Sequence, residues 1–174
     1  MTKHRGPSGR MRRMVRVGAL AGVAVLAAGC FDASGGGWLE GAEGPGTRAT
    51  FGVEASCDVV VDMFGAIGVG TVELSYIDRE AGVNVKVMSS DASCFPDAGL
   101  LSGDAGAIVV APYEARPRGE GGTATVSFFD TGESGPSKGD RFEIVLEGGV
   151  HDGYSNDGIL QGGNLTVTPV TLFD

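Results

Sequence analysis

The chain has 174 residues, and its 22 acidic residues outnumber its 13 basic ones, which gives a net charge of −9. Six of the basic residues lie before position 17, and no acidic residue precedes Asp32, so the chain after residue 29 carries seven basic and 22 acidic residues, a net charge of −15. This charge argues against nucleic-acid binding, which needs a basic surface, and against electrostatic attachment to anionic lipid.

The N-terminal segment has the layout of an export signal. A basic start that ends at Arg16 is followed by 13 uncharged apolar or small residues, 17–29, and then by Cys30. This run is too short for a permanent helix across a hydrocarbon core, which needs about 20 residues. A cationic start and a short apolar run are typical of a signal peptide. We therefore predict that residues 1–29 are removed on export.

The last residues of this run, Leu26-Ala27-Ala28-Gly29-Cys30, resemble the bacterial lipobox. That resemblance implies that Cys30 is acylated, with palmitate or a similar chain, and becomes the new N-terminus. Two or more acyl chains anchor a protein stably, so the domain would be held at the bacterial cell membrane or outer membrane, facing the periplasm or the outside. Residues 30–37 are predicted to be the lipidated cysteine and a flexible tether. A plain secretory signal and an uncleaved helix are the alternatives.

Residues 38–174 are predicted to form a single β domain. The odd positions of 49–57 are apolar and the even ones small or polar, which predicts a strand with one buried face. Residues 70–76 and 83–87 alternate likewise around a turn at 78–82 and predict a hairpin. Further strands are expected at 107–111, 123–128, 141–146, 158–161, 164–168 and 170–173, with loops at 89–106 and 130–140.

About eight short strands without helical periodicity favour an all-β fold. We expect an antiparallel β-sandwich, with a small closed β-barrel as the alternative.

Two cysteines, Cys57 and Cys94, remain once Cys30 is acylated. Thiols oxidise in exported proteins, so the two are expected to form a disulfide. Closing a loop of about 38 residues would contribute about 4 kcal/mol on the chain-entropy model. Two buried thiols that do not meet are the alternative.

Three pieces of the chain are similar to one known family. They are 35–38 with 49–53, then Asp140-Arg141-Phe142-Glu143-Ile144, then Tyr154 with 158–167, which includes Gly162-Gly163-Asn164. Together they resemble the bacterial extracellular module called the post-COAP domain. The resemblance implies a secreted or surface β-module and supplies no catalytic residues. This chain departs from the family in its lipid anchor and its cysteine pair.

A hydrolase triad could be sought at His151, Asp152 and Ser155, which supply the necessary residue types. These residues crowd one glycine-rich loop, where adjacent side chains point apart, and no Gly-x-Ser-x-Gly elbow is present. We therefore expect no catalytic residue. The carboxylates of Asp78 and Glu80, on a predicted turn, are interpreted as solubility charges.

The acidic loops near the C-terminus suggest one bound divalent cation, calcium. Calcium takes six to eight oxygen ligands from carboxylates, amides and backbone carbonyls, and glycine-rich loops let carbonyls turn inward. Neither loop has the spacing of an EF-hand, and ordinary solvated charge is the alternative. The candidate ligands are Asp130, Glu133, Asp140, Asp152, Asn156 and Asp157.

These features predict a non-catalytic surface lipoprotein that acts as a membrane-tethered binding or envelope-structural module. Its partner is left open among an envelope protein, a glycan and peptidoglycan. A lipid-anchored hydrolase of an extracellular substrate is the alternative.

Overall fold

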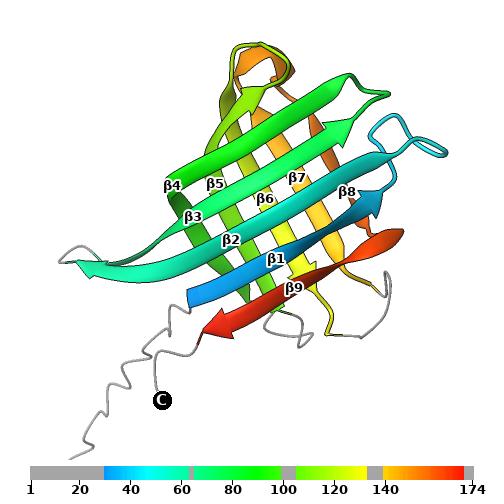
Figure 1. Ribbon diagram of the computed structural model, residues 1–174. Coiled ribbons are helices and arrows are strands. Elements are labelled where there is room, and N and C mark those ends of the chain that lie inside the picture. The colour runs from blue at the N-terminus through cyan, green and yellow to red at the C-terminus, as the bar shows by residue number, and fades with distance from the viewer. Residues whose placement is uncertain (1–29, 63–64, 99–104, 133–138, 171–174) are drawn as a thin grey trace, which may run out of the picture.

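The computed structural model describes residues 30–62, 65–98, 105–132 and 139–170. These residues form nine strands and one short 3-10 helix, as Figure 1 shows. The elements in chain order are β1 (Cys30–Leu39), β2 (Ala49–Asp62), β3 (Gly65–Asp78), β4 (Val83–Ala98), β5 (Ala105–Ala115), β6 (Gly122–Asp130), β7 (Arg141–Glu147), η1 (Gly149–His151), β8 (Ser155–Ile159) and β9 (Gly162–Val170).

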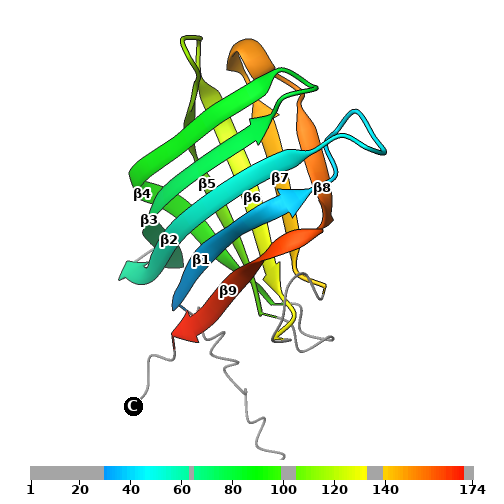
Figure 2. The same cartoon turned by 45° about the vertical axis from the view of Figure 1, so that its right-hand side comes forward.

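All nine strands belong to one antiparallel sheet, in the order β8-β7-β6-β5-β4-β3-β2-β1-β9. Strands β1 to β8 form a meander, and β9 returns to pair with the free side of β1. The sheet curls so that β9, β1, β2 and β3 lie in front of β5 to β8 (Figures 1 and 2). The register of β4 on β5 shifts between Val87 and Ser93, an irregularity of the kind that bends a strand.

The predicted all-β antiparallel fold is therefore confirmed. The two layers expected of a sandwich are parts of a single curled sheet, and the described edge strands β8 and β9 do not pair with each other. The molecule is a half-barrel.

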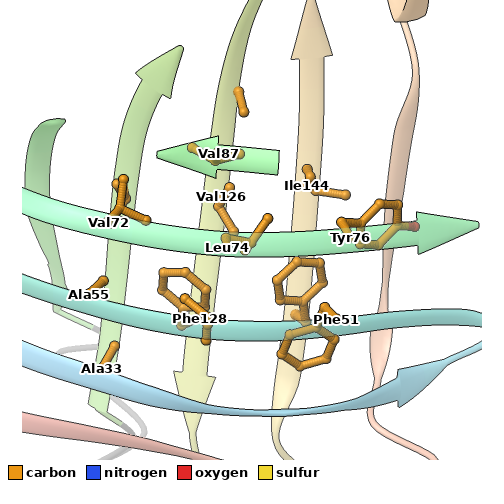
Figure 3. Close-up of a cluster of buried hydrophobic side chains, with 14 of the residues drawn as sticks. Ala33, Phe51, Ala55, Val72, Leu74, Tyr76, Val87, Val126, Phe128 and Ile144 are labelled. Atoms are coloured by element: carbon orange, nitrogen blue, oxygen red, sulfur yellow. The ribbon is translucent and has the colours of Figure 1, made fainter. Parts of the chain in front are cut away.

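The core lies between the two layers and follows from period-two alternation along each strand. Side chains of the front strands meet those of β6 and β7 in Figure 3. The rings of Phe51 on β2 and Phe142 on β7 stack with centroids 4.0 Å apart, and Phe142 also lies 5.8 Å from Tyr76 on β3. Burying one such aromatic side chain contributes roughly 1.5–3 kcal/mol, so this stack holds the layers together.

The prediction of a flexible tether at 31–37 is wrong. These residues form most of β1, which pairs with β2 on one side and β9 on the other. Phe31 and Ala33 are buried. A Cβ at Gly37 would collide with the carbonyl of Gly162 on β9, so the glycines permit the close approach of two backbones. Their missing side chains also hid the strand's alternation.

The loop predicted at 89–106 is also wrong, because β4 continues to Ala98 and β5 begins at Ala105. Ala92 and Cys94 keep the alternation and point into the core. The polar residues of 89–91 obscured the strand by lying at the bend of β4. The last predicted strand, 170–173, lies almost wholly outside the described residues, and β9 ends at Val170.

Candidate functional site

The predicted lipidation residue, Cys30, is the first residue of β1 and pairs with Val170, the last residue of β9. Residues 1–29 lie outside the described part of the chain, so the predicted signal has no structural counterpart here. Both described ends of the chain lie at the same end of the half-barrel (Figure 1). Across residues 30–170, as far as they are described, no helix is long and apolar enough to span a membrane.

The predicted disulfide between Cys57 and Cys94 is confirmed. It joins β2 to β4 across the intervening strand β3, with the two Cα atoms 6.2 Å apart. Gly68 on β3 is the register partner of Cys94, and a Cβ there would lie 3.1 Å from the Cys57 sulfur. A glycine in the middle strand therefore leaves room for the bridge.

Two of the predicted calcium ligands bind the backbone of β9 instead. The Asp140 carboxylate accepts a hydrogen bond from the N–H of Leu165 at 2.9 Å and another from the N–H of Thr131 at 3.3 Å. The Asp130 carboxylate accepts one from the N–H of Val167 at 2.9 Å. These bonds satisfy donors on the outer edge of β9 and connect that edge to the ends of β6 and β7.

Three of the remaining candidate ligands have other partners. Asp152 accepts from the N–H of Gly148 at 2.7 Å, and Asp157 forms an exposed ion pair with Arg141 at 2.7 Å. Asn156 points into the core, and Glu133 lies outside the described residues. No group of three or more His, Cys, Asp or Glu side chains in the described chain is arranged to hold a metal ion. The predicted calcium site is therefore not formed by the described candidates.

His151 and Asp152 do not form the contact that a catalytic triad requires. The imidazole of His151, at the end of η1, stacks on the ring of Tyr113 with centroids 6.3 Å apart. The Asp152 carboxylate binds the backbone N–H of Gly148, as described above. This loop is held by local packing and turn bonding.

A buried polar cluster, which the sequence did not predict, lies at the end of the half-barrel opposite Cys30. Its members are Tyr76, Asp78, Tyr154 and Asn156. The Tyr154 hydroxyl donates to Asp78 at 2.9 Å and lies 2.7 Å from the Tyr76 hydroxyl. The interpretation of Asp78 as a solubility charge is wrong, because this side chain has no exposed surface.

This cluster links the connection between β1 and β2 to the end of β3 and to β8. Asp78 accepts from the N–H of Ala42 at 2.8 Å, and the amide of Asn156 donates to the carbonyl of Glu40 at 3.0 Å. Burial, followed by the hydrogen bonds and charge of its neighbours, raises the pKa of Tyr154 far above its ordinary value. Burial also raises the pKa of Tyr76. Both phenols are held in the neutral form, which suits a structural cluster.

The outer face of the sheet carries a different kind of site, an open hollow of about 320 Å³ at the adjacent ends of β2 and β3. Thr50 of β2 and Arg48 just before that strand line one side of it. Ile77 of β3 lines the other side, together with Arg79 and Glu80 in the turn that follows. Thr50 and Ile77 are directly opposed in the ladder and form a half-buried floor. The three charged residues are exposed at its rim.

One of the rim arginines is held in place by an aromatic stack. The Arg48 guanidinium lies 4.6 Å from the centroid of the Trp38 ring. A Cβ at Gly162 would collide with the indole nitrogen, so the ring lies close against the backbone of β9. The described ion pairs, Lys86–Glu73 and Arg141–Asp157, include neither Arg48 nor Arg79. Both guanidinium groups are therefore available to a ligand.

The fold and this surface define an all-β half-barrel with a cationic hollow on one outer face. Comparison with protein-family models, with curated proteins and with solved structures found no match to the chain. The resemblance to the post-COAP module stays a prediction.

Proposed function

We propose that this protein is a bacterial surface lipoprotein, a non-catalytic binding module anchored by acyl chains on Cys30. The observation that carries the proposal is the sequence of the export segment, in which a basic start and a short apolar run end on Ala28-Gly29-Cys30. The Cys57–Cys94 disulfide supports it, because such bonds persist in oxidising compartments outside the cytoplasm.

The position of Cys30 also supports anchoring. Because β1 begins at this residue, the lipid would be attached directly to the folded domain. The connections that follow β1, β3, β5 and β7 lie at the other end, away from the attachment point (Figure 2). A lipid at Cys30 would therefore present these connections to the surrounding envelope or medium.

The test is the variant Cys30→Ser in the full-length chain. We expect the wild-type protein to fractionate with membranes, to partition into the detergent phase and to incorporate labelled palmitate. Cys30→Ser should lose all three properties, because serine offers no thiol for acylation. Ser34→Ala, four residues further along β1, is the matched control and should behave as wild type. Unchanged membrane fractionation of Cys30→Ser would refute the lipid anchor.

A further inference from the structure

We propose that the hollow lined by Arg48, Thr50, Ile77, Arg79 and Glu80 binds the carboxylate of an acidic glycan. This inference rests on the proposed function of a surface binding module and names the ligand class for it. The ligand is an extended polysaccharide with uronate sugars, bound at one or two sugar rings.

The two arginines supply the recognition chemistry. A guanidinium group presents a planar set of N–H donors that matches a carboxylate in bidentate geometry. The cation–π contact with Trp38 restricts the Arg48 side chain before any ligand arrives, which reduces the side-chain entropy lost on binding. Ile77 on the half-buried floor offers an apolar contact to the C–H face of a sugar ring.

Charge selects the carboxylate over a phosphate monoester. Arg48 and Arg79 share the rim with one acidic residue, Glu80, so the hollow has a local charge of +1 in a predicted mature chain of −15. One carboxylate neutralises this charge. A phosphate monoester carries about −1.5 to −2 at neutral pH and would leave a net negative charge inside a negative field.

Geometry favours a glycan over the lipid headgroups of the anchoring membrane. Trp38 is eight residues along β1 from Cys30, which at about 3.3 Å per residue is about 26 Å. An anchor at Cys30 would hold the hollow that far from the attachment point. The ligand then comes from the envelope or the medium.

The experiment uses the exported protein in mild detergent and follows the emission of Trp38, the only tryptophan in the chain. Oligogalacturonate should change this emission in a saturable, salt-sensitive way, and neutral dextran of equal length should not. Arg79→Gln should weaken binding by at least about tenfold, which corresponds to about 1.4 kcal/mol. Calorimetry should give the same loss for Arg48→Gln, whose substitution itself perturbs Trp38.

Two further variants separate the local charge of the hollow from the overall charge of the protein. Glu80→Gln should tighten binding about threefold, because it removes the one repulsive carboxylate at the rim. Arg118→Gln, an exposed arginine between β5 and β6, makes the same charge change away from the hollow and should alter binding by less than about twofold.

The inference would be overturned if Arg79→Gln and Arg118→Gln bound oligogalacturonate equally well. It would also be overturned if the protein bound phosphomannan more tightly than oligogalacturonate. A third contrary result would be Arg79-dependent binding of the Cys30→Ser variant to phosphatidylglycerol vesicles without any glycan binding. Each leaves the lipid-anchor proposal untouched, because anchoring is measured by fractionation. Conversely, release of the wild-type protein from membranes would refute the anchor without affecting the titration.

Discussion

At the scale of single residues, Asp78 shows how a buried carboxyl group finds hydrogen-bond donors inside the fold in place of water. Its carboxylate accepts hydrogen bonds from the Tyr154 hydroxyl and the N–H groups of Ala42 and Ala81. Buried carboxylates are tolerated when such donors replace water. The result is a junction between the ends of β1 and β3 and the start of β8.

The same cluster predicts how stability depends on alkaline pH. The pKa values of Tyr154 and Tyr76 are raised in the folded state, so their phenols stay neutral where those of the unfolded chain ionise. Their contribution is fully present below the ordinary tyrosine pKa of about 10 and is lost as the pH rises above it. Tyrosinate absorbance of these residues should therefore appear together with loss of the β-sheet circular dichroism signal.

The variant Tyr154→Phe tests this interpretation. It should lower stability at neutral pH, because the bonds to Asp78 and Tyr76 are lost, and should reduce the absorbance step that accompanies unfolding. Tyr113→Phe, which removes a hydroxyl bonded to the Gly148 carbonyl, should leave that coincident step in place. Tyrosinate absorbance of Tyr154 in the intact fold near pH 10 would contradict the prediction.

At the scale of elements, β1 brings together strands from opposite ends of the sequence. It pairs with β2, the next strand, and with β9, the last one. Its three consecutive glycines let both neighbours approach more closely than side chains would allow. The segment predicted to be a tether is therefore a strand that is paired on both sides.

A matched pair of glycines tests the role of close approach. Gly37→Ala places a methyl group against the Gly162 carbonyl and 3.2 Å from the Leu160 side chain, so we expect a loss of about 1–3 kcal/mol. Gly52→Ala, on the exposed outer face of β2 with open space at its Cβ, should be neutral or stabilising by up to about 1 kcal/mol. Urea unfolding midpoints measure both, and equal effects would refute the packing argument.

At the scale of the whole molecule, the curled sheet is closed by side chains where strand pairing stops. Asp130 and Asp140, at the ends of β6 and β7, bind N–H groups of β9. These bonds also cover part of an edge that could otherwise pair with another chain.

Removal of the closing carboxylate should therefore destabilise the domain. Asp140→Ala leaves the buried Leu165 N–H without its acceptor, and we expect a cost of about 1–3 kcal/mol in urea unfolding. Hydrogen exchange at Leu165 should also accelerate. Asp157→Ala, which breaks an exposed ion pair, is the control and should cost less than about 1 kcal/mol. Equal costs for the two variants would show that Asp140 does not close the sheet.

The amino-acid sequence by itself determined the all-β class, most strand positions and the Cys57–Cys94 pair. Period-two alternation reports one buried face directly, and the predicted export signal with two remaining cysteines led to the prediction of a disulfide. The proposed anchor at Cys30 rests on sequence alone, since residues 1–29 are outside the described structure.

Tertiary structure decided everything that depends on residues distant in the chain. Gly35, Gly36 and Gly37 carry no alternation, so only the close backbones of β2 and β9 identify them as strand. Asp130 and Asp140 were predicted to be metal ligands, but they accept hydrogen bonds from N–H groups of β9. These N–H groups follow the two carboxylates by 25 residues or more in the sequence. Arg48 and Arg79 share a hollow because the β2–β3 register aligns Thr50 with Ile77. Sequence spacing does not contain that alignment.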